Sequence, residues 1–141
     1  MSEEEVLHVG KETLAEFSGC RRIFKTAGTY RKHAVAAAKA AGATVKNAAA
    51  FHSGIGPGFR ENGRQSISHT FSRAAITIVV VLAESHIAIH TWPEFKFVAV
   101  DIFTCGEKAI NKKAIEYLKK IFQPKEVKTE SFRRRVRIFP D

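Results

Sequence analysis

The chain has 141 residues, of which 45% are apolar and 26% charged, and its formal net charge is +9. This balance is typical of one globular domain with its own core, which excludes a disordered chain, and two cysteines are too few for a disulfide-rich miniprotein. No apolar stretch reaches the ~20 residues of a membrane helix, and the acidic start, Met1–Glu5, does not resemble a secretion signal, so we expect a cytoplasmic single domain over residues 1–141.

Four elements are expected in the first half: a strand over Glu12–Cys20, a helix over Thr29–Ala41, a strand over Thr44–Phe51 and a long glycine-rich loop over His52–Ser68. In the helix, Tyr30 and a series of alanines recur at helical spacing, and Gly42 follows where a helix stops. The loop contains three alternating glycines, but Pro57 interrupts them and no Gly-Lys-Ser/Thr ending follows. These features argue against a phosphate-binding loop.

The second half predicts strands over Ala75–Ala83, His86–Trp92 and Phe97–Thr104, a helix over Lys108–Phe122 and a last strand over Val127–Phe139. The short links between the central strands favour antiparallel pairing. The element order predicts an α+β fold, a two-layer sandwich in which helices pack on one face of a largely antiparallel sheet.

The densest basic cluster, Arg133–Arg135 with Arg137, falls within the last predicted strand. Residues alternate between the two faces of a strand, so this segment would send its arginines to both sides. We therefore expect a solvated edge strand protected by charge, and no nucleic-acid surface.

Polar and reactive side chains are crowded into residues 82–107, within strands that otherwise consist of Val and Ile. Alternation places His86 and His90 on one face of their strand, and Asp101 and Cys105 on one face of the next. One face of the sheet thus resembles a core, while the other can gather imidazole, carboxylate and thiol groups.

Taken alone, these side chains also fit structural roles, a hydrogen-bonded histidine and a small packing cysteine. His86, His90 and Cys105 are candidate zinc ligands. However, four residues along a strand separate the two histidines by about 13 Å at ~3.3 Å per residue, and no second cysteine or histidine lies nearby. We therefore expect no metal.

The run Glu84-Ser85-His86-Ile87-Ala88-Ile89-His90-Thr91-Trp92-Pro93-Glu94, followed by Asp101-x-Phe103-Thr104-Cys105-Gly106, resembles the signature of prokaryotic S-adenosylmethionine decarboxylase proenzymes. The likeness extends to residues 9–20, and the length and order of elements agree along the whole chain. Members of this family are pyruvoyl-dependent and build their cofactor from their own backbone.

The resemblance implies that the chain cuts itself between Glu84 and Ser85 into a β chain, residues 1–84, and an α chain, residues 85–141. Ser85 would become the pyruvoyl group, a covalent pyruvate cofactor at the new N-terminus. His90 matches the family's proton acceptor in this processing, and Thr77 matches a hydroxyl residue that assists it.

In the decarboxylation that the resemblance implies, the substrate's amine forms an imine with the pyruvoyl group, and Cys105 matches the proton donor that follows loss of CO2. The substrate would be S-adenosylmethionine, and the product an aminopropyl donor for spermidine synthesis. Glu94 matches the carboxylate that holds the ribose hydroxyls, and Phe71 falls where an aromatic ring stacks on adenine. A homodimer of αβ pairs is implied as well.

The sequence departs from the family's usual pattern at three places. It has Ala75–Ile78 in place of Gly-Val-Ser-Gly, Lys11-Glu12 in place of Arg-His, and a longer loop over His52–Ser68. Such changes near the pocket leave open a pyruvoyl enzyme of the same fold that acts on a free amino acid, arginine or ornithine. A basic binding module that never cleaves is the alternative of another class.

Overall fold

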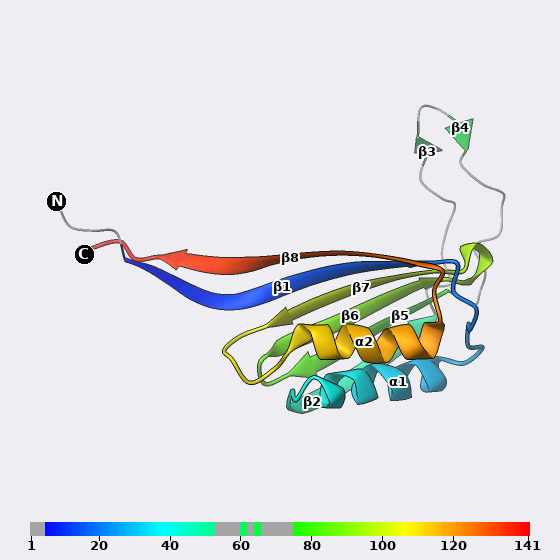
Figure 1. Ribbon diagram of the computed structural model, residues 1–141, viewed down its shortest axis with the longest axis horizontal. Helices are drawn as coiled ribbons and strands as arrows, with labels where there is room; N and C mark the ends of the chain where they lie inside the picture. The colour runs from blue at the N-terminus through cyan, green and yellow to red at the C-terminus, as the bar shows by residue number, and fades with distance from the viewer. Residues whose placement is uncertain (1–4, 53–59, 62–63, 66–74) are drawn as a thin grey trace.

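The computed structural model describes residues 5–52, 60–61, 64–65 and 75–141. Its main feature is a six-stranded sheet (Figure 1). Every neighbouring pair of strands in this sheet is antiparallel, and the strand order is β2-β5-β6-β7-β1-β8. The strands are β1 (Val6–Ser18), β2 (Val45–His52), β5 (Ile76–Leu82), β6 (Ser85–Trp92), β7 (Phe97–Thr104) and β8 (Glu126–Arg137).

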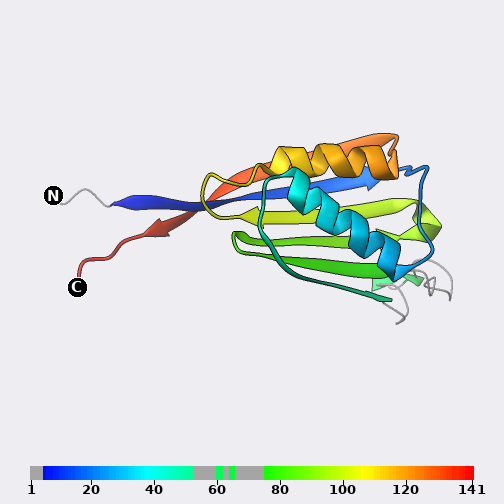
Figure 2. The same cartoon turned by 90° about the horizontal axis from the view of Figure 1, so that it is seen from below.

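Both helices, α1 (Ala27–Ala40) and α2 (Asn111–Phe122), cover the same face of the sheet (Figure 2). The core lies between the two layers, and its largest fully buried side chains include Phe17, Tyr30, Ile87, Leu118 and Phe122. The α+β sandwich with a largely antiparallel sheet is therefore confirmed.

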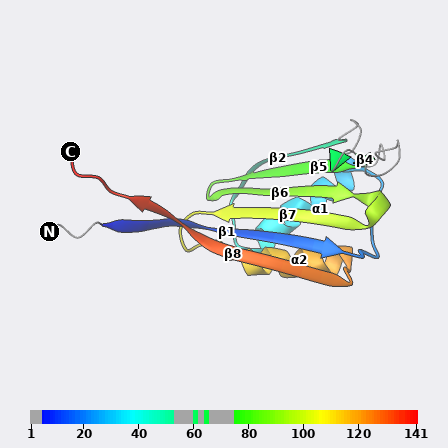
Figure 3. The same ribbon diagram turned by 90° about the horizontal axis from the view of Figure 1, so that it is seen from above.

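The opposite face of the sheet has no helix over it in the described part of the chain (Figure 3). On β6 and β7 each core residue alternates with a half-buried one, so His86, His90 and Asp101 all lie on this open face. Several apolar side chains are exposed there as well, among them Leu14, Phe51, Val79 and Phe132. The open face thus combines reactive groups with uncovered apolar surface.

The structure corrects two boundaries that the sequence predicts. β1 begins at Val6 and not at Glu12, because β8 pairs with it beyond the end of β7. α2 begins at Asn111 and not at Lys108, and the Asn111 side chain bonds Thr104 and Lys11.

The expected loop over His52–Ser68 contains a short two-stranded ladder, β3 (Arg60–Glu61) with β4 (Arg64–Gln65), and the rest of that loop is outside the described residues. β8 lies at the edge of the sheet, as predicted for the arginine-rich segment. Within the described ranges, no helix has both the length and the apolarity to cross a membrane.

Candidate active site

Ser85 is the first residue of β6 and has a backbone φ of 153°. A positive φ of this size is rarely adopted by residues other than glycine, and it costs about 1–3 kcal/mol unless the surroundings enforce it. Strain of this kind concentrates at reactive sites. The sequence motif marks the Glu84–Ser85 bond as the cleavage point, and the backbone is strained beside that bond.

The carbonyl oxygen of Glu84 accepts a hydrogen bond of 2.7 Å from the backbone N–H of Cys105. This carbonyl belongs to the bond that the motif predicts to break. A donor so placed polarises the carbonyl and can stabilise negative charge that develops on its oxygen. Sequence reasoning missed this role because it belongs to the Cys105 backbone, which only the pairing of β6 with β7 brings to Glu84.

The side chain of Glu84 is held from the other direction. Its carboxylate oxygens accept hydrogen bonds of 3.0 and 3.1 Å from the backbone N–H of Thr44, and the Lys108 ammonium lies 3.7 Å away. The Thr44 N–H holds the pKa of the Glu84 carboxyl below its usual range, with a smaller contribution from Lys108. Glu84 is therefore a fixed, ionised group whose carbonyl and carboxylate are both anchored.

The side chains of Ser85 and Cys105 lie together, with 3.3 Å between the Ser85 Oγ and the Cys105 Sγ. Cys105 follows the end of β7 and is exposed. A thiol at this distance can exchange a proton with any group that forms on residue 85. We call these two residues the Ser85–Cys105 pair.

Thr77 and His90 form a second pair, across the β5–β6 ladder, with 3.3 Å between the Thr77 Oγ1 and the His90 Nδ1. His90 lies five residues after Ser85 on β6, which places it on the order of 16 Å from Ser85 at ~3.3 Å per residue. The structure thus brings together Ser85 with Cys105, and Thr77 with His90, but it keeps the two pairs apart within one chain.

Two further predicted residues concern substrate binding. Glu94 is exposed in the short 3-10 helix η1 (Pro93–Phe95), which follows β6 at the end away from Ser85. It therefore lies on the side of the Thr77–His90 pair. Phe71 is outside the described residues.

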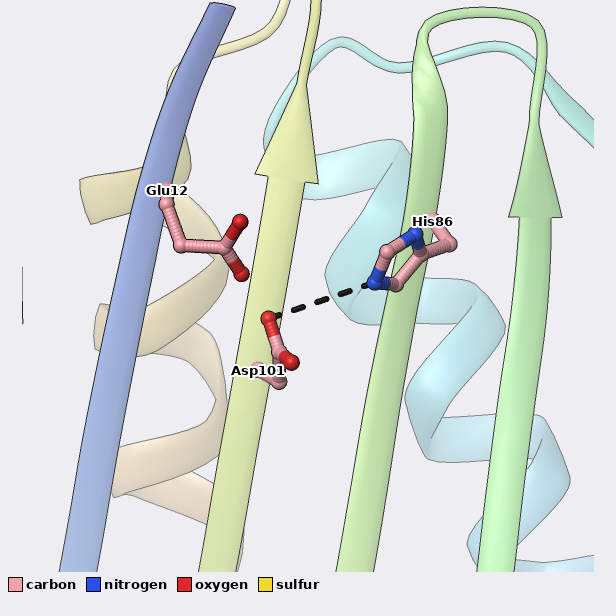
Figure 4. Close-up of side chains that lie close together, drawn as sticks. All are labelled: Glu12, His86 and Asp101. Carbon is pink, nitrogen blue, oxygen red and sulfur yellow. Dashed lines mark ion pairs between the residues drawn. The ribbon is translucent and has the colours of Figure 1, made fainter. Parts of the chain in front are cut away.

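A row of polar side chains crosses four strands of the open face, with Arg134 on β8, Glu12 on β1, Asp101 on β7 and His86 on β6. Figure 4 shows Glu12, Asp101 and His86. The Arg134 Nη1 lies 3.2 Å from the Glu12 Oε2, and the His86 Nε2 lies 3.9 Å from the Asp101 Oδ1. Burial and the neighbouring Asp101 carboxylate raise the pKa of Glu12 to about 7. Alternation in the sequence placed His86 and Asp101 on reactive faces, but only the pairing of β1 with β7 and β8 brings Glu12 and Arg134 to them.

The sequence predicts no metal site. Three side chains are candidate zinc ligands by residue type, and among the described residues they do not form one close set of ligand atoms: His86, His90 and Cys105. The one set of three candidate ligands found within those residues is Glu12, His86 and Asp101, whose ligand atoms lie within 4.8 Å of one another. The charge of Arg134 on Glu12 opposes a cation at this set.

Comparison with known proteins supports the motif. Residues 11–135 match the family model described as S-adenosylmethionine decarboxylase. An S-adenosylmethionine decarboxylase proenzyme of Pelotomaculum thermopropionicum is 36% identical over 128 residues, which cover 90% of this chain and 87% of that protein. One of Acetivibrio thermocellus is 36% identical over 129 residues, with coverages of 91% and 90%.

Among solved structures, the adenosylmethionine decarboxylase of Aquifex aeolicus superposes with a TM-score of 0.66 at 26% identity, over 90% of this chain and 91% of that one. Sequence and fold therefore agree along almost the whole length. The chain belongs to the S-adenosylmethionine decarboxylase family.

Proposed function

We propose that this protein is a self-cleaving decarboxylase that acts on S-adenosylmethionine through a pyruvoyl group made from Ser85. The observation that carries the proposal is the environment of the Glu84–Ser85 bond. A positive φ at Ser85, a hydrogen bond on the Glu84 carbonyl and an adjacent thiol all meet at this one peptide. The decarboxylated product would serve as an aminopropyl donor for spermidine synthesis.

Self-cleavage would begin when the Ser85 Oγ attacks the Glu84 carbonyl carbon, which forms an ester and releases the Ser85 nitrogen as an amine. The Cys105 N–H would stabilise the oxyanion of this step. Removal of the Ser85 α-proton, with His90 as the expected base, then expels the Glu84 carboxylate by β-elimination. Tautomerisation and hydrolysis by one water molecule release ammonia and leave the pyruvoyl group on the fragment that starts at residue 85.

The pyruvoyl ketone, once formed, supplies an electron-withdrawing group that accepts the electrons left when CO2 departs, without an external cofactor. Cys105 would donate the proton to the substrate's α-carbon, and its position 3.3 Å from the side chain of residue 85 supports this role. A cysteine thiol is one of the side chains that can act as a general acid. Glu94 would hold the ribose, and Phe71 would stack on adenine.

The distance between the two pairs supports a homodimer in which each site uses both subunits. His90 on one chain is too far from Ser85 of the same chain to remove its α-proton. A second copy, laid against the open face, would bring its own Thr77 and His90 to the Ser85–Cys105 pair. The uncovered apolar side chains on this face, such as Leu14 and Val79, supply surface for such an association.

The names of the family and of the relatives favour S-adenosylmethionine over arginine or ornithine, and they give no support to a binding module that never cleaves. The retained Glu94 also suits a nucleoside, since its carboxylate can accept two ribose hydroxyls.

Intact-mass spectrometry of the denatured protein tests the proposal. We expect two fragments that meet at Glu84/Ser85, the second of them carrying a pyruvoyl N-terminus, and CO2 release from S-adenosylmethionine but not from arginine or ornithine. Ser85→Ala should give one uncut, inactive chain. An uncut wild-type chain would reject self-processing, while cleavage with release of CO2 from arginine or ornithine would reject the substrate.

A further inference from the structure

The polar row on the open face holds a buried oxygen that has no hydrogen-bond donor among the described residues. Within the described part of the chain, the Asp101 Oδ1 is a buried side-chain oxygen without a hydrogen-bond partner. A buried acceptor without a donor lowers the stability of the folded state. Two candidate donors lie close to it: the His86 Nε2, at 3.9 Å, and a protonated carboxyl of Glu12, whose oxygen lies in the same cluster within 4.8 Å.

Strand register explains why these groups meet. Phe103 of β7 is directly opposite Glu12 of β1 on one side and His86 of β6 on the other. Asp101 lies two residues along β7 on the same face, so its carboxylate is diagonal to both neighbours, as Figure 4 shows. Two carboxylates at this separation repel each other when both are ionised, and one shared proton removes the repulsion.

The charges around Glu12 favour such sharing over full ionisation. Glu12 is only 7% exposed, so its charged form is poorly solvated, and a single guanidinium, Arg134, lies beside it. The other charged or titratable groups on this face of the packed strands include Arg134, Glu130 and Lys128 from β8, Glu16 from β1, Asp101 from β7, and His86 and His90 from β6. Carboxylates outnumber permanent cations in this set.

The row ends at the residue that is bonded to Ser85. Before cleavage, residue 85 is held from two sides, because Glu84 is anchored to Thr44 and Cys105. The proposed cleavage breaks the bond between Glu84 and residue 85, and the contacts that hold Glu84 stay with the other fragment. Residue 85 becomes a chain end whose only covalent attachment is His86. A contact that fixes His86 therefore also limits where residue 85 can lie relative to the Cys105 thiol.

We propose that Glu12 and Asp101 share one proton and that this carboxyl pair holds His86, and through it residue 85, in the position that decarboxylation requires. Glu12 is thus a positioning residue, which acts through Asp101 and His86 and does not touch the substrate. The inference rests on the proposed function for the reaction that it affects. Glu12 itself departs from the family's usual pattern, which has a histidine at this position.

The first test measures the proton directly and needs no enzyme activity. Carboxyl ¹³C NMR of the wild-type protein in chelator-treated buffer should show one glutamate with a midpoint near pH 7, assigned by its disappearance in Glu12→Gln. Asp101→Asn should move that midpoint down, because it removes the neighbouring negative charge. A Glu12 midpoint in the ordinary glutamate range, or one that moves when zinc is added, would overturn the shared proton.

The second test measures positioning. Gln at position 12 can donate its amide N–H to Asp101 and accept from Arg134, so Glu12→Gln imitates the protonated form at every pH. We expect the ratio of the Glu12→Gln rate to the wild-type rate, per cleaved subunit, to rise about tenfold between pH 6 and pH 8, as the wild-type pair loses its proton. The effect should appear in kcat and leave KM unchanged.

Glu16→Gln is the matched control, since Glu16 lies on the same strand and the same face but is exposed. Its rate ratio to wild type should stay constant with pH. A constant ratio for Glu12→Gln as well would overturn the positioning role while leaving the proposed function intact. A wild-type protein that does not cleave, or cleaves and releases no CO2 from S-adenosylmethionine, would instead reject the proposed function.

Discussion

The backbone N–H of Cys105 donates a hydrogen bond of 2.7 Å to the carbonyl oxygen of Glu84, one residue before the strained Ser85. The same residue therefore contributes twice to the site, its N–H to the peptide bond before residue 85 and its thiol to the Ser85 side chain. Because the N–H survives any substitution of the side chain, the two proposed steps can be separated by mutation.

Replacement of the Cys105 side chain should impair decarboxylation but not cleavage. Cys105→Ala keeps the backbone donor, so we expect two fragments by mass spectrometry. The rate of CO2 release should fall by about 100-fold or more, a typical contribution of a positioned general acid. Cys105→Ser, a poorer acid of similar size, should cleave equally well and decarboxylate slowly. Turnover at the wild-type rate in either variant would remove Cys105 from the proton-donor role.

The strain at Ser85 predicts an unusual order of stabilities. Glycine adopts a positive φ without steric cost, so the free energy of unfolding should be larger for Ser85→Gly than for Ser85→Ala, by about 1 kcal/mol or more. Neither variant can cleave. Ser18, at the end of β1, has no positive φ and provides the control, since Ser18→Gly should be less stable than Ser18→Ala. Chemical denaturation measures both pairs, and the same order at both positions would contradict strain at Ser85.

A site shared between subunits predicts complementation of two inactive variants. Homodimers of His90→Ala should not cleave, and homodimers of Cys105→Ala should cleave but decarboxylate slowly. In a mixed dimer, one site receives both substitutions and the other receives none. Co-expression should therefore restore decarboxylation to about a quarter of the wild-type rate, because half of the dimers are mixed and each has one intact site of two. Activity no higher than that of Cys105→Ala alone would place each site within one chain.

The stability of the protein should fall as the pH rises through neutrality. Burial and Asp101 raise the pKa of Glu12 from 4.5 to about 7, so the folded state binds this proton more tightly than the unfolded chain does. The contribution of this proton is complete below pH 4.5 and is lost as the pH rises through 7. Between pH 5 and pH 8 we expect the free energy of unfolding to decrease by up to about 3 kcal/mol at 1.36 kcal/mol per pKa unit.

Denaturant unfolding of Glu12→Gln measures that contribution, because glutamine does not titrate. The decrease between pH 5 and pH 8 should be smaller in Glu12→Gln than in the wild-type protein, and Glu16→Gln should follow the wild type. An equal decrease in all three proteins would assign the pH dependence to other groups.

Local patterns in the sequence were sufficient for the layers of the fold. Alternation along residues 86–92 and 97–104 predicted one core face and one reactive face, and the structure confirms both, because side chains of a strand must point to opposite sides. The spacing of Tyr30 and the alanines predicted the buried stripe of α1 for a similar reason. The dense motif around Ser85 identified the family that the comparisons confirm.

Relationships between strands were decided only by the tertiary structure. The sequence could list Ser85, His90 and Cys105 together, but pairing of β6 with β7 brings Cys105 to Ser85, while the length of β6 separates His90 from both. Glu12 and Asp101 are far apart in sequence, so nothing local could predict their contact or the raised pKa of Glu12. Strand register creates such sites because it joins residues that share a face but no stretch of chain.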